Sequence, residues 1–256
     1  IIQSERFPVI RLTRIFRQAQ KSKIVTNAHR IKNGYMPELH NSPESDFIFL
    51  EEETPEDTLK DIMHLVQEVI PCKYGFSPEE IQVLSPMKKG PVGTEVLNRE
   101  LQKILTPNGN SLERLGQQYR KGDRVMQLRN DYDKNIFNGD IGIVQKIDVE
   151  EKSMSVLEDD HLVEYAVEEL DDLSLAFSIT IHKSQGSEYP VVVLPILTSH
   201  FVMLQRNLLY TALTRGKKYV FILGQKKAIA MAVHNEKVAK RNSNLCERIR
   251  ALPYIA

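Results

Sequence analysis

The run SITIHKSQGSEYP, at residues 178–190, joins an apolar strand pattern to a polar loop that follows it directly. In open parallel sheets, ligands bind just beyond the carboxyl ends of the strands, where such a loop lies. Gly186 lets the backbone approach a ligand closely. The side chains suited to phosphate oxygens are Thr180, His182, Lys183 and Ser184. Judged on residue types alone, a solvated loop without a ligand fits the run equally well.

A second run, NLLYTALTRGKK at residues 207–218, predicts a helix with one apolar face and an arginine at its end. A guanidinium can grip a phosphate with two bonds, and an arginine at a γ-phosphate stabilises charge that develops during hydrolysis. Arg215 could also be the cation that complements the carboxyl end of the helix. Taken alone, the run favours this simpler role.

Apolar strands and amphipathic helices alternate along much of the chain. This alternation is typical of a parallel sheet covered by helices on both faces. One helix has a strong start signal, with Thr54 as the cap, Pro55 at the first position and Asp57 three residues after the cap. The expected strands are residues 46–50, 81–84, 177–182, 191–194 and 219–223, and the expected helices are residues 23–34, 54–69, 94–105, 204–215, 226–240 and 245–252.

The pattern changes near Gly116, after which short β-like runs replace the helices. Such a series of short strands predicts a small β-barrel inserted into the larger domain. We therefore expect an α/β domain at residues 1–118 and 171–256, with the barrel at residues 119–170. The four β-like runs are residues 124–128, 141–147, 154–157 and 162–167.

Together, the two opening runs resemble motifs V and VI of superfamily 1 helicases, and they are most similar to the RecD/TraA branch, superfamily 1B. The resemblance continues along the chain in the family's order. It implies a RecA-like parallel sheet flanked by helices (domain 2A) with an inserted SH3-like β-barrel (domain 2B). The further segments that carry it are LTRIFRQ at residues 12–18 (motif IV), LSPMKKGPVG at residues 84–93 (motif IVa), and KGDRVMQ at residues 121–127 with NGDIG at residues 138–142 (domain 2B).

The resemblance implies the C-terminal motor half of an ATP-dependent DNA helicase that travels 5′ to 3′. Arg17 and Arg215 would then reach the γ-phosphate of ATP. Gln185, Gly186 and Glu188 would lie at the nucleotide, with Glu188 accepting from the ribose hydroxyls. Single-stranded DNA and duplex/single-strand junctions are the implied partners. The residues implied in the DNA path are Thr180, His182, Lys183, Ser184, Ser85, Met87, Lys88 and Asn98.

The chain contains no G-x-x-x-x-G-K-[ST] loop, the segment that cradles the phosphates of ATP. In the family this loop belongs to an N-terminal domain that precedes motif IV. We therefore expect ATP and Mg²⁺ to be bound mainly by that N-terminal domain, which is an expected partner of this chain. We also expect the chain alone to be inactive as an ATP hydrolase. The first residue, Ile1, is not an initiator methionine, which fits a boundary inside a longer protein.

Lys+Arg and Asp+Glu both number 34, so the formal net charge is zero. This balance argues against a protein coated in basic surface, although a narrow phosphate-binding track needs only a local cluster. Cys72 and Cys246 lack CxxC spacing and are expected to be reduced thiols. No histidine pair has metal-ligand spacing, so we expect no metal site, and we expect a bacterial-type cytoplasmic location without a membrane partner.

Two other functions stay open at this stage. The helicase half of a conjugative relaxase would share every motif, and only a histidine-rich metal site and a tyrosine nucleophile upstream would separate it. The second is a non-catalytic module that binds DNA or protein. For such a module, substituting Arg17 or Arg215 in the full protein is expected to leave turnover unchanged. Within the helicase reading, resemblance to the RecD branch implies DNA repair or recombination.

Overall fold

The computed structural model describes residues 1–10, 22–158, 160–236 and 244–252. Its larger sheet has five strands in the order β1-β12-β11-β2-β10, and every neighbouring pair is parallel. Each predicted strand overlaps one observed strand, which confirms the expected parallel sheet. The strands are β1 (Phe47–Glu51), β2 (Ile81–Ser85), β10 (Ser178–Thr180), β11 (Tyr189–Ile196) and β12 (Gly216–Gly224).

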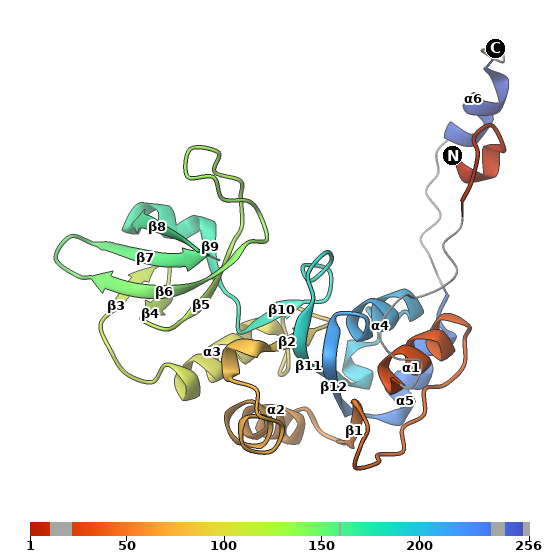
Figure 1. Cartoon of the computed structure of the whole chain (residues 1–256), viewed down its shortest axis with the longest axis horizontal. Helices are drawn as coiled ribbons and strands as arrows, with labels where there is room; N and C mark the ends of the chain where they lie inside the picture. Colours follow the sequence, from red (N-terminus) through yellow and green to blue (C-terminus); the bar gives the residue numbers. More distant parts are fainter. Residues whose placement is uncertain (11–21, 159, 237–243, 253–256) are drawn as a thin grey trace.

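Helices cover both faces of this sheet (Figure 1). Because side chains alternate along a strand, Val191 of β11 packs on one face and Val192 on the other. The Val192 face carries α1 (Lys23–Lys32), α4 (Arg206–Leu213) and α5 (Lys226–His234), and the Val191 face carries α2 (Pro55–His64), the π-helix η2 (Leu65–Tyr74) and α3 (Thr94–Leu105). The resulting core has two apolar layers, one on each side of the sheet.

The helix bounds agree only partly with the predicted ones. The cap of α2 is confirmed, since Thr54 accepts from the Asp57 N–H at 3.1 Å. Beyond His64, however, the α-helical bonding gives way to a π-helix that contains Pro71. The bounds of α3 match the prediction, whereas α5 ends at His234, short of the predicted residue 240. Residues 237–240 of that prediction lie outside the described residues.

A second sheet is antiparallel, with the strand order β8-β7-β6-β5-β9. All four predicted β-like runs fall on its strands, while the β-rich region begins earlier and ends later than residues 119–170. Among the described residues no pairing joins the outer strands β8 and β9, so a closed barrel and its boundaries stay predictions. The strands are β5 (Arg124–Gln127), β6 (Ile141–Asp148), β7 (Ser153–Glu158), β8 (His161–Ala166) and β9 (Leu173–Leu175), preceded by the hairpin of β3 (Ser111–Arg114) and β4 (Gln117–Arg120).

The side chain of Asn98, on α3, hydrogen-bonds the segment between β9 and β10, where the chain passes from the antiparallel sheet to the parallel one. Its amide donates to the carbonyls of Leu175 and Ser178 at 3.0 and 2.9 Å, and its oxygen accepts from the Ser178 N–H at 2.7 Å. Leu175 ends β9 and Ser178 begins β10. Both amide hydrogens of Asn98 are therefore engaged in positioning β10.

Asp123, just before β5, is a buried carboxylate that ties the antiparallel sheet to α3. It accepts from the Thr106 hydroxyl and the Gln102 amide, each at 2.5 Å, and from the Arg120 N–H at 2.7 Å. Burial raises the pKa of Asp123, while the bonds from Thr106, Arg120 and Gln102 act in the opposite direction. These donors offset the cost of burying the carboxylate.

Asp123→Ala is expected to lower the free energy of unfolding by about 3 kcal/mol, because it leaves three donors, two of them on buried side chains, without their acceptor. Asp123→Asn keeps one acceptor oxygen and should lose about half as much. Urea unfolding followed by circular dichroism measures both. The exposed Asp133 supplies the control, with Asp133→Ala expected within about 0.5 kcal/mol of wild type. Equal stability of the two alanine variants would contradict this account of Asp123.

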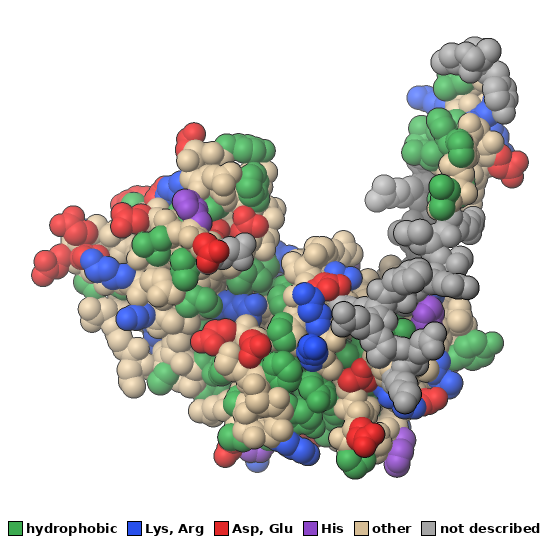
Figure 2. Space-filling view, viewed as in Figure 1, with side chains coloured by type: hydrophobic (Ala, Val, Ile, Leu, Met, Phe, Trp, Pro, Cys, Tyr) green, Lys and Arg blue, Asp and Glu red, His purple; other side chains and the backbone are tan. Residues whose placement is uncertain are grey.

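The first and last described segments lie together, apart from the two sheets (Figure 1). There, η1 (Ile2–Ser4) contacts α6 (Leu245–Ala251), and Arg250 donates to the Gln3 carbonyl at 2.6 Å. Acidic and basic side chains are interspersed over the face shown in Figure 2. No helix among the described residues is long and apolar enough to cross a membrane. The remaining short helices are η3 (Pro78–Glu80), η4 (Val167–Asp172) and η5 (Thr198–His200).

Candidate functional site

The loop at residues 181–188 joins the carboxyl end of the edge strand β10 to the amino end of the central strand β11, and both strands pair with β2. At its start, the Ile181 N–H donates to the carbonyl of Ser85, the last residue of β2, at 3.1 Å. At its end, the Tyr189 N–H donates to the Arg215 carbonyl at 2.8 Å. The loop is thus held at both ends by neighbouring strands.

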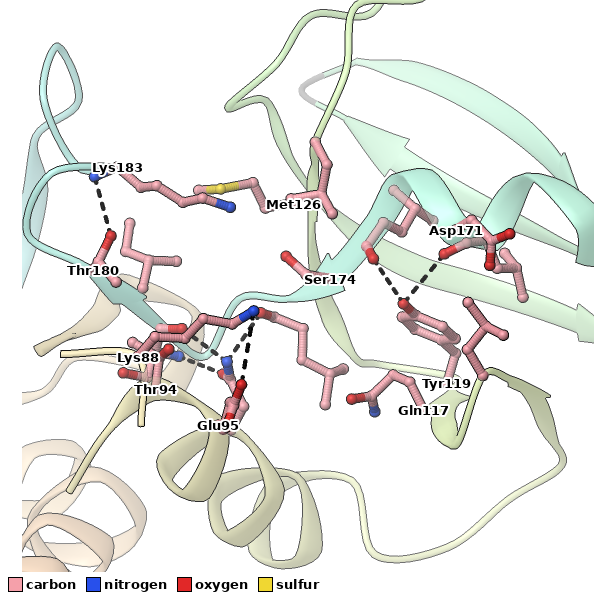
Figure 3. A pocket seen from close by; sticks show the side chains of 18 of the residues that line it. Lys88, Thr94, Glu95, Gln117, Tyr119, Met126, Asp171, Ser174, Thr180 and Lys183 are labelled. Atoms are coloured by element: carbon pink, nitrogen blue, oxygen red, sulfur yellow. Dashed lines mark hydrogen bonds and ion pairs between the residues drawn. The ribbon is translucent and has the colours of Figure 1, made fainter. Parts of the chain in front are cut away.

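One flank of this loop forms part of a pocket of about 400 Å³ between the two sheets (Figure 3). The opposite wall belongs to the antiparallel sheet and the β3–β4 hairpin. Figure 3 shows the Lys183 side chain extending across the pocket beside Met126 of β5. The predicted residues that the structure brings together here are Lys88, Asn98, Thr180 and Lys183.

The two lysines at this pocket influence each other. Burial, and then the positive charge of Lys88, lower the pKa of Lys183. Lys88 also lies 3.7 Å from the exposed carboxylate of Glu95. An anion bound between the two ammonium groups would relieve their repulsion, so the pocket is suited to a phosphate.

Two predicted contacts have their hydroxyls turned inward. Ser85 is fully buried, donates to the Val92 carbonyl at 2.8 Å and accepts from the Met87 N–H at 3.3 Å. Ser184 is also buried and donates to the Ile181 carbonyl at 2.8 Å. These bonds shape the two loops, and the half-buried Met87 lies next to the first of them.

The other flank of the 181–188 loop lies along α4. His182 and Gln185 line a small pocket of about 80 Å³ there, with Thr211 of the helix on the opposite side. The structure therefore separates His182 from Lys183, although the sequence places them side by side in one predicted path. Neighbouring residues of an irregular loop readily face opposite sides, and this one does so.

The guanidinium of Arg215 joins α4 to the loop. It donates to the carbonyls of Ser187 and Thr211 at 2.9 and 3.3 Å, and to the Thr214 hydroxyl at 3.3 Å. All three acceptors are neutral oxygens, so these bonds orient the group without neutralising its charge. The two runs that resemble motifs V and VI therefore meet at Arg215.

The other predicted nucleotide residues lie next to this junction. Gly186 has a φ of 94°, and a Cβ there would meet no atom within 4 Å, so its requirement is conformational. Glu188 is exposed, with its carboxylate 3.7 Å from the ammonium of Lys217. Arg17, the second predicted arginine, lies outside the described residues. Among the residues that the structure describes, no group of His, Cys, Asp or Glu could hold a metal ion.

The antiparallel sheet contributes pocket residues that sequence reasoning missed. Met126 and Ser174 line the pocket from the paired strands β5 and β9. Arg114 and Asp171 line it too and form a two-bond ion pair, with both bonds at 2.9 Å. No local signal identifies this wall, because folding brings together segments that are far apart in the sequence.

Two family models match the chain, the ATP-dependent RecD-like DNA helicase SH3 domain at residues 97–157 and the UvrD-like helicase C-terminal domain at residues 175–223. The ATP-dependent RecD2 DNA helicase of Deinococcus radiodurans is 36% identical over 244 residues, which cover 95% of this chain and 32% of that protein. The RecBCD enzyme subunit RecD of Mycolicibacterium smegmatis is 30% identical over 172 residues, 67% of this chain and 30% of that protein. The chain thus spans about a third of the length of these relatives.

Solved structures show a similar fold. The Pif1 helicase from Bacteroides in complex with ADP-AlF3 and ssDNA has a TM-score of 0.54 at 18% identity, covering 94% of this chain and 56% of that one. A structure of two coordinating Pif1 helicases at forked dsDNA gives 0.50 at 20% identity, covering 93% and 53%. The parallel sheet with its flanking helices fits a RecA-like helicase fold.

Proposed function

This chain belongs to the RecD-like helicases of superfamily 1B, and we propose that it forms the second half of an ATP-driven DNA motor. The observation that carries the proposal is that the two flanks of the 181–188 loop serve two sites. Lys183 faces the pocket between the sheets, whereas Ser187 is bonded to Arg215 on the other side. One short segment thus adjoins both sites, as a motor that turns hydrolysis into movement requires.

Single-stranded DNA follows the pocket in this proposal, and the protein loads at duplex/single-strand junctions. Lys88 and Lys183 neutralise phosphates, Thr180 donates to the backbone, and the half-buried side chain of Met87 lies beside the strand. Such contacts recognise the backbone and stacked bases, so the expected binding has little dependence on base sequence. His182, on the α4 flank, belongs instead to the nucleotide side of the loop.

At the nucleotide side, Arg215 reaches the γ-phosphate of ATP, and Arg17 serves as a second arginine. ATP and Mg²⁺ are held mainly by an N-terminal P-loop domain, so the catalytic set is complete only when the cleft between the two domains closes. Glu188 accepts from the ribose hydroxyls, with Gln185 and Gly186 beside it. The neutral partners of Arg215 support this role, since its charge remains available for a phosphate.

Opening and closing of that cleft moves the strand past one domain at a time. We infer 5′-to-3′ travel from membership of the RecD-like branch. We also infer that residues 119–170 form an SH3-like barrel inserted into a domain made of residues 1–118 and 171–256. The match to the RecD-like SH3 domain and the antiparallel sheet support this division. From the similarity to the RecD2 and RecD proteins we also infer a role in DNA repair or recombination, in the bacterial cytoplasm.

The chain on its own is expected to bind single-stranded DNA weakly, with an affinity that falls as salt rises. Neutralising two phosphates, at Lys88 and Lys183, gives a slope of about −1.4 in a plot of log affinity against log salt. Between about 50 and 200 mM salt the affinity then falls about sevenfold. Fluorescence anisotropy with a labelled thymidine oligonucleotide measures this slope, and salt-independent binding would contradict the proposed DNA path.

A further inference from the structure

The KGDRVMQ run places a partly buried arginine between the two sheets. Arg124, the first residue of β5, donates to the carbonyls of Glu79 and Ile81 at 3.0 and 3.2 Å, at the amino end of β2. Burial lowers the pKa of Arg124. Removing a cation from water is costly unless its donors are satisfied, so these contacts are what keep it in place.

The same guanidinium also lies over the ring of Tyr189, 5.8 Å from the ring centroid. A cation is attracted to an aromatic face, and more strongly where water is excluded. Tyr189 is only 6% exposed, and its backbone N–H donates to the Arg215 carbonyl at 2.8 Å. Burial raises the pKa of Tyr189, while the charges of Arg124 and Arg215 oppose that rise. Tyr189 therefore contacts both arginines, Arg124 through its ring and Arg215 through its backbone N–H.

Arg124 is connected to the pocket wall as well. Met126, two residues further along β5, lines the pocket, and residues two apart share one face of a strand. The Arg124 carbonyl accepts from the Ala176 N–H at 2.7 Å, directly after β9. Since β9 supplies Ser174 to the same wall, a shift of this pair of strands is passed directly to the contacts of Arg124.

We propose that Arg124 and Tyr189 are positioning residues that couple occupancy of the pocket to the placement of Arg215. This inference rests on the proposed function, because it takes the pocket as the DNA path and Arg215 as the residue that meets ATP. DNA against β5 fixes Arg124, Arg124 fixes the ring of Tyr189, and Tyr189 holds the backbone of Arg215. Neither residue touches DNA or nucleotide, so the pair sets how strongly DNA stimulates hydrolysis.

The test uses the full-length protein with its P-loop domain. For wild type, Arg124→Gln, Tyr189→Leu and the double variant, three quantities are measured: the Kd for single-stranded DNA, ATP hydrolysis with and without saturating DNA, and the melting temperature. Each single variant should lose about threefold in DNA stimulation while Kd and basal hydrolysis stay within about twofold. The double variant should fall no further than either single, because both residues lie on one path.

Conservative variants separate positioning from general destabilisation. Tyr189→Phe keeps the aromatic face and should retain more than about half of the wild-type stimulation. Arg124→Lys keeps the charge but not the planar grip on two carbonyls, so a loss of stimulation is expected with a melting temperature near wild type. If Arg124→Gln or Tyr189→Leu unfolds, Arg124→Lys decides, and undiminished stimulation in it overturns the inference.

Three further results would overturn it: full stimulation in both single variants, additive losses in the double variant, or a loss of stimulation matched by an equal loss of DNA affinity. In each case, the proposed helicase function still holds as long as DNA stimulates ATP hydrolysis by the wild-type protein. A wild-type protein that DNA does not stimulate contradicts the proposed function, and the coupling falls with it.

Discussion

Replacing Arg215 by alanine in the full-length protein is expected to lower kcat for ATP hydrolysis about 10³-fold while KM for ATP changes little. The guanidinium interacts most strongly with the γ-phosphate when charge develops in the transition state, so its loss adds about 4 kcal/mol to the barrier. Three bonds to neutral oxygens already orient it at the junction of α4 and the loop. Steady-state hydrolysis at saturating single-stranded DNA measures the effect.

Lys218 provides the matched control, because it is an exposed cation three residues further along the same segment. Lys218→Ala should change kcat less than about twofold. Arg215→Lys keeps a charge without the two-pronged geometry and should fall between wild type and Arg215→Ala. A large rise in KM with kcat unchanged would mean that Arg215 only binds ground-state phosphate, contrary to the proposal.

The second large effect is expected for DNA binding. The double variant Lys88→Ala/Lys183→Ala should weaken binding of single-stranded DNA about fiftyfold at low salt, since each lysine neutralises one phosphate. The slope of log affinity against log salt should become shallower by about 0.7 for each lysine removed. Both effects should be uniform for thymidine and mixed-sequence oligonucleotides, because the contacts are to the backbone. Anisotropy titrations at several salt concentrations measure affinity and slope together.

Lys103 is the control for charge alone. It is exposed on α3 and forms a surface ion pair with Glu100 at 2.9 Å, away from the pocket. Lys103→Ala should leave both the affinity and the salt slope close to wild type. If the Lys88/Lys183 variant behaves like Lys103→Ala, the pocket between the sheets is not the DNA path.

The parallel sheet could be predicted from sequence because its information is local. Continuous apolar strands such as β11 and capped helices such as α2 and α3 carry their own signals. The π-helix after His64 carries no such signal, because its apolar residues continue along the helix face that α2 begins. The strands β3 and β4 were missed because each has a single apolar or aromatic residue among polar ones, and the three residues of β9 are too few to show a period.

The sequence indicates which residues of the candidate site lie near one another, but not how their side chains are oriented. The sequence places Thr180, Lys183 and Lys88 in one path, and the structure brings them to one pocket. Ser85 carries the same hydroxyl that a phosphate contact needs, yet its hydroxyl donates to Val92. Residue type cannot separate these outcomes, because the choice depends on which backbone oxygen lies closest after folding.

The partners of Asp123 and Arg124 could not be predicted from the sequence either. Charged residues are expected at the surface, so the sequence does not indicate that Asp123 and Arg124 have partners inside the fold. Their partners, in α3, at the amino end of β2 and in β11, come from three different parts of the chain. Only the assembled fold shows that this pair joins the two sheets.

We propose that this chain supplies the arginine-bearing half of a DNA-driven ATP hydrolase. The most direct measurement is the rate of ATP hydrolysis by the full-length wild-type protein with and without saturating single-stranded DNA. Stimulation of about tenfold or more by DNA is expected if DNA and nucleotide bind on the two sides of the 181–188 loop. Hydrolysis that is absent, or indifferent to DNA, would contradict it and favour a non-catalytic binding module.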